Sequence, residues 1–144
     1  MEEIETLRAY IKQGKYSDAL QLIDELDEMS RDDKIHKVES YMRVLLIHLI
    51  KKEVEQRTTR SWEVSITESL RQIARVNKRR KSGGHYLSEN ELTEALEEVF
   101  PDAVLRASLE VMEGTLDDKQ LKELIDKARI RQEASQLILE FQNQ

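Results

Sequence analysis

The stretch Val44-Leu45-Leu46-Ile47-His48-Leu49-Ile50 is apolar at six of its seven positions, although 36% of the residues in this 144-residue chain are charged. Arg43 precedes the stretch and Lys51 follows it. A helix that is apolar on every face has to be surrounded by other helices. The stretch therefore predicts a buried central helix, which we place at residues 31–55, with amphipathic helices packed around it.

The spacing of apolar residues predicts helices along the rest of the chain. Steps of three and four, the period of one helical face, recur in residues 4–11, 19–29, 62–73, 92–99, 104–112 and 121–141. Four Gly and a single Pro favour long helices with short connections. We expect one all-α domain over residues 1–144, a helical bundle of four main helices and several shorter ones.

Three serines are candidate N-caps, because Ser is among the residues preferred at the start of a helix. Ser30 predicts a helix beginning at residue 31, and Ser61 predicts one beginning at residue 62. Ser88 is followed three residues later by Glu91, which matches the capping-box pattern.

Three further patterns in the sequence each predict one feature of the helices. Pro101 predicts a break or restart, since Pro is favoured in a first helical turn and not inside a helix. Residues 116–142 predict one additional amphipathic C-terminal helix. The expected buried stripe of the helix after Gly14 consists of Ala19, Leu22, Ile23, Leu26 and Met29.

Composition excludes several classes of protein. The chain has no Cys, which excludes disulfides, cysteine zinc sites and thiol catalysis. Residues 1–5 are acidic and lack the basic start and apolar core of a signal peptide. The apolar stretch is far shorter than the roughly 20 residues that a membrane span needs. We therefore expect a cytoplasmic protein without a membrane partner.

Charge is distributed unevenly along the chain. Residues 1–50 carry seven basic and eleven acidic side chains, residues 51–81 carry ten and four, and residues 82–144 carry six and fourteen. A basic middle in an acidic chain can pair internally, with another subunit or with an external polyanion. Internal pairing is the interpretation that we favour.

The basic segment 71–81 is a candidate contact for nucleic acid, because clustered cations are the electrostatic footprint of such proteins. The alternative is a solvated helix end, where cations are favoured by the helix dipole. Tyr86 alone is near enough to stack on a base. The candidate residues are Arg71, Arg75, Lys78, Arg79, Arg80 and Lys81.

Arg43 and His48 form an Arg-x4-His string, a spacing found in helical ribonucleases of the HEPN type. In those enzymes the Arg holds the phosphate and the His moves the proton. At 100° per residue, however, the two side chains lie about 140° apart around a helix. The interpretation that we favour makes Arg43 an ion-pair residue and His48 a hydrogen-bonded core histidine.

No pattern in the sequence indicates a metal or a cofactor. Gly83-Gly84 is not followed by the residues of a phosphate-binding loop. Neither His36, His48 nor His85 belongs to a Glu-x-x-His motif, which di-iron bundles use. We therefore expect no metal, no cofactor and no assignable catalytic residue.

Three segments together resemble a bacterial family named domain of unknown function twenty-nine. They are Gly14–Asp18 leading into Leu22–Met29, then Glu39–Lys51, and then Arg57 with Arg60-Ser61-Trp62. The likeness covers about residues 5–115, and the charged tail beyond residue 115 departs from it. The resemblance implies an all-helical bundle and no activity, because the family has none assigned.

These observations favour a non-catalytic interaction or assembly protein that is expected to bind itself or another protein. The C-terminal amphipathic helix is the expected partner surface, with Leu137, Ile138, Leu139 and Phe141 near its end. A nucleic-acid-binding module using residues 71–81 is the second hypothesis, and a ribonuclease using Arg43 and His48 is the third.

Overall fold

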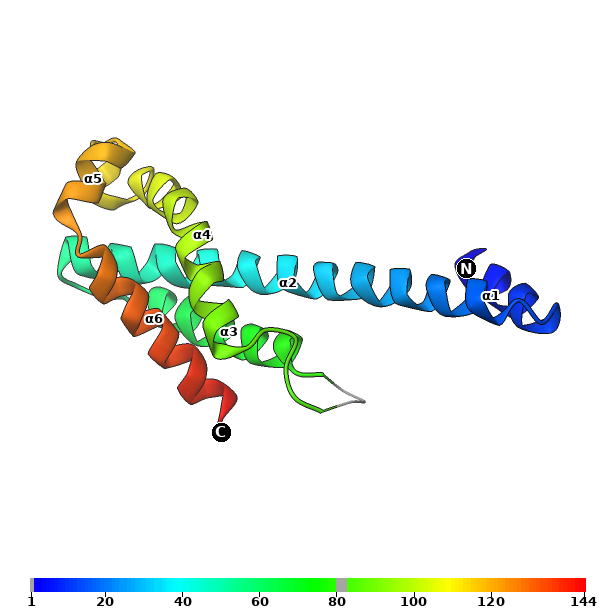
Figure 1. Cartoon of the computed structure of the whole chain (residues 1–144). Coiled ribbons are helices and arrows are strands. Elements are labelled where there is room, and N and C mark those ends of the chain that lie inside the picture. The colour runs from blue at the N-terminus through cyan, green and yellow to red at the C-terminus, as the bar shows by residue number, and fades with distance from the viewer. Residues whose placement is uncertain (1, 80–82) are drawn as a thin grey trace. The chain divides into compact units, whose positions relative to one another are not determined.

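The structure, a computed structural model, describes residues 2–79 and 83–144 of the chain. Within these ranges the chain forms six α-helices and one 3-10 turn and no strand, so the predicted all-α class is confirmed. Figure 1 shows these elements along the chain. Their bounds are α1 (Glu2–Lys12), α2 (Tyr16–Glu55), α3 (Arg60–Asn77), α4 (Glu89–Ser108), η1 (Val111–Gly114), α5 (Asp118–Leu124) and α6 (Lys127–Gln142).

The chain divides into two compact units, Met1–Lys34 and Ile35–Gln144, with the boundary inside α2. The second unit holds the apolar core, to which α2, α3, α4, η1, α5 and α6 all contribute. Within this unit α6 packs against α3 and α4, and α4 also contacts α5 and η1. The largest fully buried side chains include Met42, Leu46, Ile73, Leu96, Phe100, Leu121, Ile130 and Ile138.

The seven-residue apolar stretch of α2 is buried on one side only. Leu45, Leu46, Leu49 and Ile50 are buried, and they fall within an arc of about 140° around the helix. Val44 is 36% exposed, and Ile47 and His48 are half-buried. The expectation of burial on every face is therefore wrong, because the neighbouring helices cover a single arc.

The central helix does not begin at residue 31. Ser30 lies inside α2, which is helical from Tyr16 to Glu55. No Gly or Pro occurs between these residues, and a Ser in a helix interior costs only about 0.5 kcal/mol relative to Ala. An N-cap also requires the chain to leave the helix before it, and nothing in this segment forces that.

The caps of α3 and α4 are set by side-chain hydrogen bonds. Ser61 is not the cap of α3, because Thr59 takes that role and its Oγ1 accepts from the Trp62 N–H at 3.1 Å. The predicted capping box of α4 is confirmed. The Ser88 hydroxyl accepts from the Glu91 N–H at 3.2 Å, and the Glu91 carboxylate accepts from the Ser88 N–H at 3.1 Å.

Pro101 lies inside α4 and neither breaks nor restarts it. Proline removes one helical hydrogen bond, but Phe100, Ala103 and Val104 are buried around it and hold the helix on both sides. Tertiary packing therefore outweighs the local preference at this position.

The single helix expected over residues 116–142 is two helices. Asp117 caps α5 through a capping box with Gln120, and Asp126 caps α6 by accepting from the Arg129 N–H at 3.1 Å. Between them Ile125 is extended and packs against the core. Each Asp gives its helix a separate start.

Candidate functional site

Arg43 links α2 to α4. Its Nε lies 2.5 Å from Oδ2 of Asp102, and Arg106 donates to the same oxygen at 2.9 Å. The Asp102 carboxylate therefore contacts two guanidinium groups. Its ion pair with Arg43 determines which side of α2 faces α4. This contact agrees with a structural role for Arg43.

His48 lies on the part of α2 that is only half covered. Its ring Nδ1 donates to the Val44 carbonyl oxygen at 2.8 Å, one turn earlier in the same helix. A carbonyl oxygen can only accept a hydrogen bond, so the proton of this bond is on Nδ1, and Nε2 takes no part in the bond. Arg43 and His48 are thus each engaged with a different partner, and the helical geometry keeps them about 140° apart.

The described residues of the basic segment differ in their contacts. Arg71 is paired with Glu68 on its own helix at 2.8 Å. Arg79 lies over the Tyr86 ring, 5.4 Å from its centroid, so the one aromatic near this segment already has a cation on its face. Arg75 and Lys78 are exposed. Arg80 and Lys81 lie outside the described residues.

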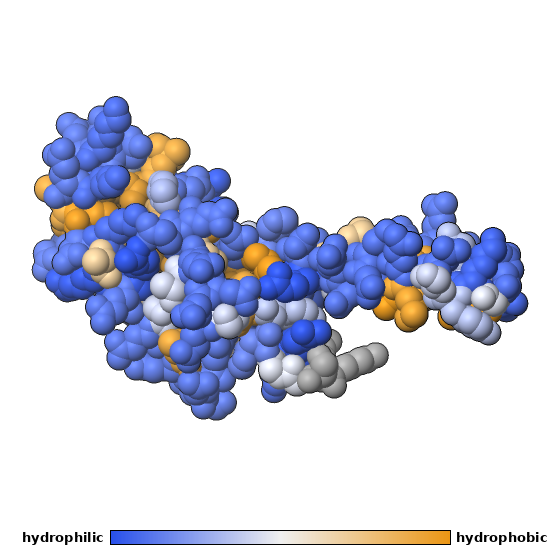
Figure 2. Space-filling view, in the orientation of Figure 1, coloured by the Kyte–Doolittle hydropathy of each residue, from blue (hydrophilic) through white to orange (hydrophobic). Residues whose placement is uncertain are grey.

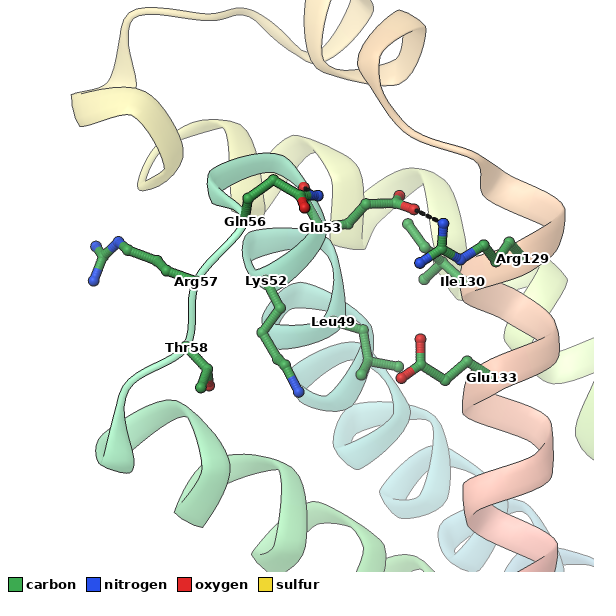
Figure 3. A pocket seen from close by; sticks show the side chains of 9 residues that line it. All are labelled: Leu49, Lys52, Glu53, Gln56, Arg57, Thr58, Arg129, Ile130 and Glu133. Atoms are coloured by element: carbon green, nitrogen blue, oxygen red, sulfur yellow. Dashed lines mark hydrogen bonds and ion pairs between the residues drawn. The ribbon is translucent and has the colours of Figure 1, made fainter.

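A pocket of about 340 Å³ opens where α2 ends, beside the connector to α3 and the first turns of α6. Figure 3 shows Lys52, Glu53 and Gln56 reaching it from the end of α2, and Arg129 and Glu133 reaching it from α6. Leu49 and Ile130 supply its apolar wall.

The cations of this pocket are already matched by carboxylates. Lys52 pairs with Glu63 at 2.8 Å, and Arg129 pairs with Glu53 at 3.6 Å. Arg57 pairs with Glu55 at 2.9 Å. A site that binds an anion strongly needs unmatched positive charge, so these ion pairs favour a structural role for the pocket.

Glu63, the ion-pair partner of Lys52, has a clearly displaced pKa. Its pKa is lowered from the ordinary value of 4.5 because Lys52 and Thr58 both donate hydrogen bonds to its carboxylate, with a further contribution from the charge of Lys52. Burial acts in the opposite direction. The ionised carboxylate therefore joins α3 to the end of α2 and to the connector.

Trp62, the last residue of the Arg-x-x-Arg-Ser-Trp segment, contacts two cations through its ring. The Lys51 ammonium and the Arg57 guanidinium each lie 4.6 Å from the centroid of its ring. Lys51 is only 7% exposed and also pairs with Glu110 at 3.5 Å. A buried Lys at this position was not predicted, and the only sequence signal for it is that it directly follows the apolar stretch.

The predicted partner surface on α6 is used within the chain. Ile130, Ala134 and Ile138 are buried, and Leu137, Leu139 and Phe141 pack against the same core. The apolar face of α6, which is the expected partner surface, therefore packs on α3 and α4 within the chain.

The unit Met1–Lys34 presents the opposite situation. The predicted buried stripe of residues 19–29 is wrong, because among the described residues of this unit only Ala19 is buried. Ile4 and Ile11 on α1 are 42% and 49% exposed. Figure 2 shows hydrophobic surface on the first half of α2.

Three of the exposed residues share one face of α2. Tyr16, Leu20 and Ile23 are 65%, 63% and 43% exposed, and the spacing i, i+4, i+7 places them within an arc of about 60°. We call these three residues the exposed stripe. Apolar positions at this spacing are those by which one helix contacts another.

Carboxylates follow the exposed stripe. Asp24 is four residues after Leu20, and Asp27 is four residues after Ile23, so each lies about 40° around the helix from its apolar neighbour. Residues 16–34 contain seven acidic and two basic side chains. The stripe therefore combines exposed apolar surface with negative charge.

In the part of the chain that the structure describes, no helix has the length and apolar character needed to cross a bilayer. No curated protein and no solved structure matches the chain. The sequence model of one family, described as Domain of unknown function DUF29, matches residues 1–135 of 144. The match extends beyond the expected segment 5–115 at both ends, so the predicted departure of the tail from the family is wrong for residues 116–135. The chain belongs to the DUF29 family.

Proposed function

We propose that this protein is a non-catalytic protein-interaction module and that the exposed stripe on α2 is its contact surface. The observation that carries the proposal is the exposure of Tyr16, Leu20 and Ile23, at 65%, 63% and 43%, at contact spacing on one helix. Exposed apolar groups gathered at one place are typical of protein-binding sites. Helices α3, α4 and α6, in contrast, bury their apolar faces in the core of residues 35–144.

Site-specific photo-crosslinking in cells tests the proposal. A photoreactive residue is placed at Leu20 or Ile23, and at Val64 as the matched control, because Val64 is also an exposed apolar residue, at 58%. We expect a discrete adduct from positions 20 and 23 that competing unlabelled protein removes. Adducts of equal yield from all three positions, or none from positions 20 and 23, would contradict the proposal.

The two alternatives have weaker support. A nucleic-acid site would use Arg75 and Lys78, which are exposed, but Arg71 and Arg79 already contact Glu68 and Tyr86. A ribonuclease would need Arg43 and His48 to contact the same substrate. Support for this function would be cleavage of mixed RNA that is lost in His48→Ala while the variant remains folded.

A further inference from the structure

The exposed stripe lies on a length of α2 that is acidic. The unit of residues 1–34 contains ten acidic and five basic side chains, and residues 16–34 account for the whole imbalance. Residues 2–15 contain three of each. The negative charge is therefore concentrated on the same length of α2 that carries the stripe.

The carboxylates lie beside the apolar residues rather than far from them. Asp24 and Asp27 are both exposed and lie about one turn beyond Leu20 and Ile23 on the same side of α2. Side chains that flank a helix contact determine which charge is accepted in the partner. A partner that covers Leu20 and Ile23 has to place its flanking residues near these two carboxylates.

On these grounds we propose that the exposed stripe binds a cationic amphipathic helix, with apolar residues of the partner on Leu20 and Ile23 and its Lys or Arg side chains near Asp24 and Asp27. This inference rests on the proposed interaction function and specifies the partner. It corresponds to recognition of an amphipathic helix through anchors at i, i+4 and i+7.

Other occupants fit the same face less well. A second copy bound stripe to stripe in parallel would bring Asp24 and Asp27 near their own counterparts. In either direction it would join two lengths of α2 that each carry seven acidic and two basic side chains, and like charges across an interface are unfavourable. An anionic membrane surface would be repelled for the same reason. The chain's own basic helix α3 is amphipathic, but its apolar face, including Ile66, Leu70 and Ile73, is buried.

The test uses the full chain and a fluorescent peptide of about 18 residues, five helical turns, built only from Leu and Lys with Leu on one face. A second peptide has Glu in place of Lys, and a third has the same Leu and Lys in scrambled order. Binding is measured by fluorescence anisotropy at about 50 and about 300 mM salt, a range over which screening changes strongly.

We expect saturable binding of the Leu/Lys peptide, at least about tenfold weaker binding of the Glu and scrambled peptides, and weakening at the higher salt concentration. Leu20→Ser with Ile23→Ser should reduce the affinity about tenfold or more, and Asp24→Asn with Asp27→Asn should do the same. The matched controls are Val64→Ser for the apolar change and Glu94→Gln with Glu98→Gln for the charge change, because both glutamates are exposed on α4. They should leave the affinity unchanged.

Three results would overturn the inference. Equal binding of the Lys and Glu peptides would remove the charge argument. A loss of affinity in the Glu94/Glu98 control equal to that in the Asp24/Asp27 variant would indicate adsorption by net charge alone. No binding of the Leu/Lys peptide, together with a position-specific crosslink from Ile23, would leave the interaction function standing with a partner of different chemistry. A crosslink of twice the mass of the chain would identify that partner as a second copy.

Discussion

Arg43 of α2 and Asp102 of α4 form an ion pair in which the Arg43 Nε lies 2.5 Å from the Asp102 Oδ2. Both side chains are about one-third exposed, at 31% and 38%. Arg106 shares the same carboxylate oxygen. The residue that could have been a phosphate-binding Arg is thus engaged between two helices.

We expect this pair to stabilise the fold modestly. Arg43→Gln and Asp102→Asn should show a coupling of about 0.5–1 kcal/mol in a double-mutant cycle, because partly exposed ion pairs are screened by solvent. Urea unfolding of the wild type, the two single variants and the double variant measures this coupling. Strictly additive losses would mean that Arg43 does not act through Asp102.

The connection after α4 contains consecutive residues in the left-handed region. Met112, Glu113 and Gly114 have φ values of +49°, +58° and +73°, and the carboxylate of Glu55 accepts from the Met112 N–H at 3.3 Å. A residue with a Cβ is strained in this conformation, by roughly 1–2 kcal/mol.

Glu113→Gly should therefore raise the free energy of unfolding by about 1 kcal/mol, the strain that the Cβ imposes. Glu94→Gly, an exposed position inside α4, is the matched control and should lower it by about 1 kcal/mol, because Gly is unfavourable in a helix interior. Equal losses in the two variants, read from urea unfolding, would argue against the left-handed turn.

Glu63 predicts a dependence of stability on pH. Its folded pKa lies below the ordinary value of 4.5, so its ionised form stabilises the fold above that value, and the stabilisation is lost as the pH falls through the lowered pKa. At neutral pH Glu63→Gln should reduce the free energy of unfolding by no more than about 1 kcal/mol, since the side chain is 46% exposed.

The difference between the wild type and Glu63→Gln should shrink as the pH is lowered from 4.5 through the depressed pKa. Urea unfolding at a series of pH values measures this difference. Glu68→Gln is a control on the same helix, paired with Arg71 and away from the end of α2. A difference for Glu63→Gln that grows on acidification would contradict the hydrogen bonds from Lys52 and Thr58.

Two apolar residues of α2 should respond differently to truncation. Leu46→Ala should lower the free energy of unfolding by about 2–5 kcal/mol, because Leu46 is fully buried. Ile23→Ala should change it by at most about 1 kcal/mol, because Ile23 is 43% exposed. If both variants lost the same stability, as measured by urea unfolding, Ile23 would have to be covered within the chain.

The basic segment should not bind RNA strongly. Arg71 is paired with Glu68, and the chain has a net charge of −6. We expect no complex with single-stranded RNA at about 50 mM salt, a condition that favours phosphate contacts. The opposite result would be a salt-dependent complex that is lost in Arg75→Ala with Lys78→Ala and kept in the control Lys119→Ala with Lys122→Ala, two exposed cations on α5.

Local signals in the sequence predicted some features of the fold well and others badly. The capping box of Ser88 and Glu91 depends on residues three apart, so the sequence contains all of it. Ser30 and Pro101 carry equally clear local signals, but both lie inside a helix, so the helix start predicted at Ser30 and the break predicted at Pro101 are both wrong. At Pro101 the buried residues on either side hold the helix, and the effect of such packing cannot be read from neighbouring residues alone.

The candidate site was the least predictable part. The apolar stripe of residues 19–29 and the apolar face of α6 have similar patterns in the sequence. The face of α6 is covered by α3 and α4, whereas in residues 19–29 only Ala19 is buried, and Ile23 and Met29 are exposed. Periodicity indicates that a helix has an apolar face, and it does not indicate which other helix is close enough to cover that face.

The amino-acid sequence alone determined the all-α class, the family, and the positions of the apolar faces, because helical period and capping depend on residues only a few positions apart. Only the tertiary structure decided which of these faces are buried, that Lys51 and Arg57 both lie over the Trp62 ring, and that Tyr16, Leu20 and Ile23 remain exposed. The physical reason is that burial depends on which helices distant in the chain come into contact, and no short stretch of sequence contains both partners.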